Sequence, residues 1–169
     1  MPVTSLADRR AALLDQLAYL NDEIEALRQI VKVVPEPLLS GRPLPEDLSI
    51  KELYGWIAQQ DAEVHQPRLE RLLAEDTPQV TEADQAAMLA ERDWNAKPIG
   101  DLLTAVQSAR TAFIDFLKAI PEADWTRTLD LDEHRYDVYA YLFEVIQANT
   151  ADLRTLGYRL HGSLGQARR

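Results

Sequence analysis

Histidine is the residue type in this sequence with the most obvious capacity for chemistry, because imidazole nitrogens bind transition metals and exchange protons near neutral pH. The chain of 169 residues has three histidines, His65, His134 and His161. Two histidines that bind one metal from a single helix are typically one turn apart, and no pair here has that spacing. We therefore expect all three to lie at the surface. Only His65, two turns beyond Trp56, is placed to line a pocket.

A second set of candidate residues is polar but falls on helix faces that otherwise carry apolar side chains. Gln60, Asn149 and Asp152 belong to this set. A carboxylate inside a bundle needs hydrogen-bond partners, so the three predict a polar network. Such a network fixes the register of a bundle more often than it catalyses a reaction, and a catalytic role for Asp152 is the alternative.

Overall composition excludes several classes of partner. The chain has 18 basic and 28 acidic residues, a formal net charge of -10. Nucleic acids and anionic membrane surfaces both select for clustered lysine and arginine, so we expect neither as a partner. No apolar run approaches the ~20 residues that span a bilayer. The absence of cysteine excludes disulfides and thiolate ligands, and it fits a cytoplasmic protein.

The elements that must position these residues are helices. A stripe from Leu13 to Val34 repeats every three or four residues, and Pro35 and Pro37 end it. After a polar loop to residue 48, Ser49 and Glu52 form a capping box that opens a second helix. That helix continues to about residue 76, with a kink or break near His65–Gln66 because Pro67 lies inside the pattern.

The rest of the chain predicts a long crossover and two further helices. A short helix of about residues 82–92, opened by a capping box at Thr81, lies within the crossover. The third helix spans about residues 98–119, and residues 128–134 form a loop or a short extended piece. The fourth spans about residues 136–156 and stops at Gly157. We expect one all-α, four-helix-bundle domain over residues 1–160 and a flexible tail over residues 161–169.

Several short motifs, taken in order, resemble those of the DinB-like superfamily. The segment from Leu48 to Gln59, with Ser49-Ile50-Lys51-Glu52 at its start, is similar to the second-helix motif of that family. Arg92-Asp93-Trp94-Asn95 resembles its crossover signature, Arg110 matches an arginine of its third helix, and Asp124-Trp125-Thr126-Arg127 resembles its turn. The resemblance implies an up-down-down-up bundle, frequent homodimers, and a divalent metal held by three histidines for hydrolase or thiol-transferase chemistry.

This sequence departs from the family pattern at the metal ligands. The resemblance places the histidine of helix two at Trp56 and the pair of helix four at Ala148 and Asp152. An indole nitrogen keeps its proton, an alanine offers no donor, and one carboxylate cannot hold zinc or nickel alone. We therefore expect a metal-free site, with Trp56, Gln60, Ala148 and Asp152 as the ancestral metal-site or pocket positions. Trp56 either fills the space that the metal would leave or serves as a recognition residue in an open pocket.

Two functional hypotheses follow. The first is a non-catalytic bundle with a degenerate metal site, which binds a small molecule or a partner protein and forms a homodimer. Exposed apolar residues expected on helix one, Leu14, Ile30 and Val33, support the homodimer. The second is a metal-dependent hydrolase or thiol transferase with a relocated site that uses Asp152, Gln60 and a histidine. A DNA-associated role is disfavoured by the acidic charge.

Overall fold

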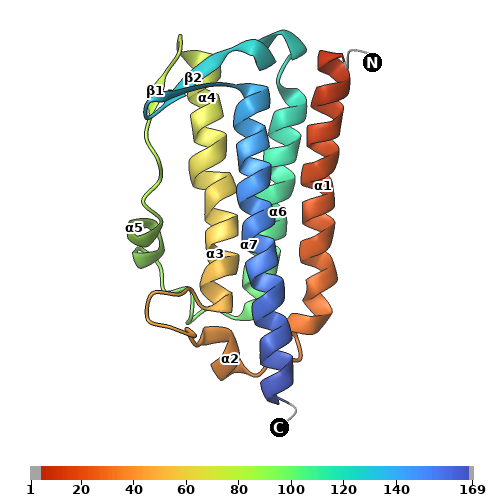
Figure 1. The fold of residues 1–169 in the computed structure, drawn as a ribbon, viewed down its shortest axis with the longest axis vertical. Coiled ribbons are helices and arrows are strands. Elements are labelled where there is room, and N and C mark those ends of the chain that lie inside the picture. Colours follow the sequence, from red (N-terminus) through yellow and green to blue (C-terminus); the bar gives the residue numbers. More distant parts are fainter. Residues whose placement is uncertain (1–4, 168–169) are drawn as a thin grey trace.

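The computed structural model describes residues 5–167, with side chains for residues 5–165. Within this range, four long helical rods lie side by side along the axis of the molecule (Figure 1). The elements in chain order are α1 (Leu6–Val31), α2 (Glu36–Ser40), α3 (Ile50–Gln59), η1 (Gln60–His65), α4 (Gln66–Ala74), β1 (Gln79–Val80), α5 (Gln85–Ala90), α6 (Ile99–Ala119), η2 (Glu122–Thr126), β2 (Thr128–Leu131), β3 (His134–Asp137) and α7 (Val138–Ala167). The predicted four-helix bundle is confirmed.

The order of the rods follows from the long crossover. In Figure 1, α1 and α7 run in one sense, whereas the rod made of α3, η1 and α4 and the rod α6 run in the other. The chain after α4 passes along the outside of the bundle through β1 and α5 before α6 begins at the opposite end. Two consecutive rods can point the same way only because this connection is long.

The second rod stays continuous at Pro67, and the irregularity expected near His65–Gln66 is present as a wide helical turn rather than a break. Residues 60–65 form a π-helix between α3 and α4. The backbone N–H of Gln66 donates to the carbonyl of Asp61, five residues back, so the turn is wider than an α-turn. Proline cannot donate to the ladder, and a π-turn absorbs this irregularity without ending the helix.

Serine side chains begin two of the rods. Ser5 accepts from the backbone N–H of Asp8, and Ser49 accepts from that of Glu52, each in a complete capping box. The predicted capping box at Thr81 is wrong: α5 begins at Gln85, and Asp84 caps it by accepting from the N–H of Ala87. Residues 79–80 pair as a strand just before this point, and residues 81–84 belong to no helix or strand.

The last helix is longer than predicted. It continues through Gly157, the expected stop, to Ala167. No glycine in the described chain has a positive φ angle, so Gly157 is not the left-handed residue that ends many helices. Residues 161–167 of the predicted tail therefore belong to α7, and residues 168–169 lie outside the described residues. The flexibility of this segment stays a prediction.

A small sheet closes one end of the bundle. Strand β2 pairs in parallel with β1 of the crossover and antiparallel with β3. Asp132 adopts a positive φ of 51° in the β2–β3 turn, which aspartate tolerates better than most residues. Trp125 is buried beneath this end, and Arg127 donates to the carbonyls of Leu72 and Glu75 at the end of α4.

The core consists of two apolar clusters separated by polar residues. One cluster contains Phe113 and Trp125, and the other contains Trp56 and Leu156. Between them along their helices lie buried polar side chains, Asp61 in η1, Arg110 in α6 and Asn149 in α7. This layer sits at the π-helix, so the irregular backbone and the polar core coincide.

Candidate functional site

Three of the four positions predicted for the site lie inside the bundle. Trp56 and Gln60 are buried, Asp152 is half-buried, and Ala148, one turn before Asp152, is exposed. Gln60 Nε2 donates to Asp152 Oδ2 at 3.4 Å, a long hydrogen bond that joins η1 to α7. Trp56 packs in the same apolar cluster as Leu156. The predicted contact between helix two and helix four is therefore present at Gln60 and Asp152.

The Asp152 carboxylate has an unusual environment. Burial raises the pKa of the Asp152 carboxyl from its ordinary 3.8 to about 6, and the hydrogen bond from Gln60 opposes this rise. A carboxyl with this pKa exchanges a proton in the range where a general acid or base works. Among the described residues, the carboxylate accepts its side-chain hydrogen bond from the amide of Gln60. This amide is neutral, so it does not hold Asp152 in its ionised form as a cation would.

These positions do not fit a divalent metal. Zinc and nickel sites need at least three protein donors around one point, mostly imidazole or carboxylate. The four positions offer one carboxylate and one amide, since the Trp56 indole has no free lone pair and Ala148 has no donor. Among the residues that the structure describes, no three His, Asp or Glu side chains gather in a group that could hold a metal ion.

His65 is buried, which contradicts the surface position expected for it. Its Nδ1 lies 2.9 Å from the hydroxyl of Tyr141, and that hydroxyl also accepts from Arg68 Nη1 at 3.3 Å. Arginine can only donate, so the Tyr141 oxygen accepts from Arg68, whereas the donor between Tyr141 and His65 Nδ1 depends on the tautomer of the histidine. Burial, then the charges of Arg68 and Arg110, lower the pKa of His65 to about 3. His134 and His161 are exposed, as expected.

The polar residues of the core form a different network from the predicted one. Arg110 Nε donates to Asp61 Oδ2 at 2.6 Å, and its Nη2 donates to Asn149 Oδ1. Asp61 and Arg110 are completely buried. Asn149 thus joins Arg110, while Gln60 and Asp152 form a separate pair. Asp61 was not predicted as a core residue. Arg110 could have indicated it, because an arginine among the inward-facing residues of a helix requires a buried acid as its partner.

A hollow lined by both polar and apolar residues lies elsewhere, near the end of the bundle that carries α2. It is a cavity of about 520 Å³ between α2, the loop that follows it, the start of α3 and the last third of α7. The residues that line it are Pro37, Leu38, Gly41, Arg42, Pro43, Ile50, Thr155, Tyr158, Arg159, Gly162 and Ser163. Sequence patterns did not indicate this pocket, because its walls come from residues 37–50 and residues 155–163, two segments that are distant in the chain.

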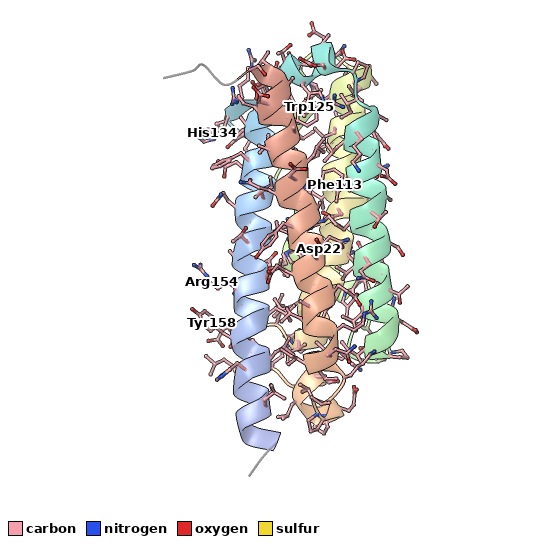
Figure 2. The ribbon with its side chains drawn as sticks, turned by 90° about the vertical axis from the view of Figure 1, so that its right-hand side faces the viewer. Asp22, Phe113, Trp125, His134, Arg154 and Tyr158 are labelled. Atoms are coloured by element: carbon pink, nitrogen blue, oxygen red, sulfur yellow. The ribbon has the colours of Figure 1, made fainter. Side chains whose placement is uncertain are left out.

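The pocket lies on the same face of α7 as Asp152. Thr155, Arg159 and Ser163 follow Asp152 at intervals of three and four residues, which places them in one row along the helix. The half-buried Asp152 is thus one turn from the nearest wall of the pocket. Figure 2 shows Tyr158, at the outer rim, projecting away from the bundle beside Arg154.

Two arginines of the pocket are held in place by residues that lie next to its lining. Arg42 donates to both oxygens of Glu52, at 2.9 and 2.5 Å, and to the carbonyl of Pro45 at 3.3 Å. Arg159 donates to the carbonyl of Leu48 at 2.6 Å and lies 3.3 Å from Asp47 Oδ1. The loop between α2 and α3 is therefore fastened both to itself and to α7.

Comparison with solved structures identifies the fold. The chain superposes on YfiT from Bacillus subtilis, whose structure is described as that of a probable metal-dependent hydrolase with an unusual four-helix bundle topology. The TM-score is 0.75 over 95% of this chain and 92% of that chain, at 14% sequence identity. This chain has the YfiT fold. The DinB-like bundle that the motifs predicted is confirmed at the level of the fold.

Sequence comparisons add no closer relative. The sequence matches no protein-family model and no curated protein. At 14% identity the YfiT fold carries over the arrangement of helices but not the chemistry of the site. None of the helices described here is both long and apolar enough to cross a lipid bilayer. The function must therefore be argued from the residues of this chain.

Proposed function

We propose that this protein is a metal-independent small-molecule-binding bundle, and that the ligand occupies the pocket between α2, α3 and α7. One observation carries the proposal: the pocket has a volume of about 520 Å³, within the roughly 300–1,000 Å³ typical of small-molecule sites. Its lining combines apolar side chains such as Leu38 and Ile50 with the polar groups of Arg42, Thr155 and Arg159. A few polar groups in an apolar hollow fix the orientation of a ligand.

The positions that correspond to a metal site support the same proposal. Trp56 is 7% exposed and packs against neighbouring apolar side chains, which favours its role as a filler of the space that a metal would leave. Gln60 Nε2 donates to Asp152 Oδ2, so these two positions are joined by a hydrogen bond between side chains. We therefore propose that the metal site of this fold is degenerate here and that binding has moved along α7 to the adjacent pocket.

A fragment screen by nuclear magnetic resonance tests the pocket. We expect hits to shift backbone amide signals of Gly41, Thr155 and Gly162. A side chain at Gly162 has open space, so Gly162→Phe should fill the pocket and abolish these shifts. Gly165→Phe is the matched control, because Gly165 also has open space and lies on the same helix outside the pocket. Fragments that shift the same amide signals in Gly162→Phe as in the wild type would contradict the proposal.

The competing function is a metal-dependent hydrolase or thiol transferase with a relocated site. The pKa of about 6 at Asp152 favours this candidate, since it suits proton transfer near neutral pH. Metal analysis of the purified protein separates the two. Stoichiometric zinc or nickel that disappears in Asp152→Ala would establish the metalloenzyme. Metal below stoichiometry in the wild type and an unchanged value in the variant would support the metal-free bundle.

We further propose a cytoplasmic homodimer that does not bind nucleic acid, in line with the net charge of -10. The support on helix one differs from what the sequence suggested. Val33 is 66% exposed, but Leu14 and Ile30 are half-buried against the core clusters. The exposed aromatic residues Tyr19 and Phe143, on α1 and α7, offer a better dimer surface.

A further inference from the structure

The α2–α3–α7 pocket contains two guanidinium groups whose capacity to donate is not used up. An arginine has five N–H groups. Arg42 places three on Glu52 and Pro45, and Arg159 directs its contacts to Leu48 and Asp47. Within residues 5–165, each guanidinium keeps N–H groups that no protein acceptor takes up. Both side chains line the pocket, so a ligand inside it lies next to both arginines.

The contacts that the two arginines do make prepare them for a ligand. Glu52 holds Arg42 through a two-point contact, and Glu52 is itself fixed by the Ser49 backbone N–H. Arg159 is only 17% exposed and is anchored to a backbone carbonyl. A guanidinium held in this way loses little side-chain entropy when a ligand binds, so the interaction with an oxyanion is stronger than at a free surface arginine.

Apolar groups form much of the remaining lining, beside the hydroxyls of Thr155 and Ser163. Pro37, Leu38, Pro43 and Ile50 come from α2, the following loop and α3, and the ring of Tyr158 stands at the rim, 75% exposed. An inorganic ion would leave these apolar surfaces in contact with water, so they would contribute nothing to binding. A ligand with an apolar body and an oxyanion head uses both parts of the lining, because the body displaces water from the prolines while the head accepts from the arginines.

We infer that the pocket recognises an amphipathic organic anion, an aromatic or aliphatic body that carries one carboxylate or sulfonate. This inference rests on the proposed small-molecule function and names its ligand class. The Arg42–Glu52 and Arg159–Asp47 pairs are each close to neutral, so the site suits a single negative charge rather than a polyanion.

Two fluorescent probes with similar bodies test the inference on the full chain. 1-Anilinonaphthalene-8-sulfonate carries the anion, and N-phenyl-1-naphthylamine is its neutral counterpart. We expect the wild type to bind the sulfonate about tenfold more tightly than the amine or better, as charge-assisted hydrogen bonds predict. Arg42→Gln and Arg159→Gln should each remove most of this preference. Arg159→Lys, which keeps the charge, should retain part of it.

Two controls distinguish loss of anion recognition from loss of the pocket itself. Arg154→Gln removes an exposed arginine of the same helix outside the pocket, and it should leave both affinities unchanged. The amine reports whether a variant still has an intact pocket, since it needs no guanidinium. Equal affinity for both probes, unaffected by Arg42→Gln and Arg159→Gln, would overturn the anion inference while the binding proposal stands on the fragment screen. Failure of the wild type to bind the sulfonate would overturn it as well.

Discussion

At the scale of single residues, Asp152 links the inside of the bundle to the pocket. It accepts a hydrogen bond from Gln60 in η1 and stands one turn before Thr155 in the pocket wall. Burial raises the pKa of the Asp152 carboxyl to about 6. Because the folded protein holds this proton more tightly than the unfolded chain, ionisation of Asp152 weakens the folded state.

The stability of the protein should therefore depend on pH at this residue. The destabilisation by Asp152 is absent below pH 3.8, grows as the pH rises towards about 6, and is complete above it. Asp152→Asn removes it, so at about pH 8 the variant should be more stable than the wild type by about 1–2 kcal/mol, allowing for partial exposure. At about pH 4 the two should differ little. Urea unfolding at both values measures this difference.

An exposed position on the same helix gives the control for this variant. Ala148→Asn adds an amide one turn earlier without removing an acid, so its effect on the free energy of unfolding should be the same at both pH values. If Asp152→Asn also showed equal effects at the two pH values, Asp152 would not titrate as the structure requires.

The buried pair of Asp61 and Arg110 gives a second prediction at this scale. Arg110→Met would leave the Asp61 carboxylate in the core without its cation and Asn149 Oδ1 without its donor. We expect a loss of about 3–5 kcal/mol in the free energy of unfolding. The double variant Asp61→Leu with Arg110→Met should lose less than Arg110→Met alone, because no buried charge remains. If the losses in the free energy of unfolding of the two single variants simply added in the double variant, the pairing of Asp61 with Arg110 would be contradicted.

At the scale of elements, the crossover is fastened to the bundle by close packing at a glycine. A Cβ atom at Gly55 in α3 would lie 2.3 Å from Trp94 Cδ2, so the tryptophan of the crossover sits directly on the helix backbone. Ser49 Oγ and Lys51 Nζ bond to Asn95 beside it. The Arg92-Asp93-Trp94-Asn95 segment thus attaches the crossover to the start of α3.

Two glycine substitutions should have opposite effects on stability. Gly55→Ala should cost about 1–3 kcal/mol, because either the Trp94 ring or the helix must move. Gly157→Ala should instead stabilise the protein by about 0.5–1 kcal/mol, because α7 continues through this position and a Cβ atom there meets open space. Thermal unfolding of both variants measures the signs. A destabilised Gly157→Ala would mean that α7 ends near Gly157 after all.

The sequence predicts the long rods and misses most of the irregular elements. Apolar periodicity and the Ser49 capping box locate α1, α3 and α6 within a few residues. The π-turn at residues 60–65 was not predicted, and of the sheet only the extended piece within residues 128–134 was anticipated. The pairing of β2 with β1 joins segments about fifty residues apart, which local patterns do not contain. Gly157 was wrongly predicted to end the last helix. Glycine inside a helix lowers its stability, but a helix that packs against the bundle on both sides of the glycine tolerates it.

The candidate site was predictable only in part, for the same reason. Gln60 and Asp152 were expected to meet, and they do. His65 was expected at the surface because its spacing fits no metal pair, but the wide turn of η1 places it inside, against Tyr141. The pocket between α2 and α7 requires the fold of the loop after Ser40, which has no periodic signal of its own.

At the scale of the whole molecule, the face formed by α1 and α7 is the best candidate for contact with a second copy. Tyr19 is 62% and Phe143 is 49% exposed. A groove of about 420 Å³ between these two helices has Tyr19, Leu20 and Ile146 among its lining residues. Aromatic side chains at the edge of an apolar groove are typical of the centre of a protein interface. A two-fold axis would place the Tyr19 of each copy against the groove of the other.

Sedimentation velocity should therefore detect a dimer, and Tyr19→Glu or Phe143→Glu should weaken it at least about tenfold, because a carboxylate would be buried at the interface. Leu44→Glu is the matched control: Leu44 is 54% exposed but lies in the loop between α2 and α3, away from this face. Each copy carries a net charge of -10, so the copies repel and added salt should strengthen the dimer. A dimer that dissociates in salt, or that tolerates glutamate at both aromatic positions, would use a different face.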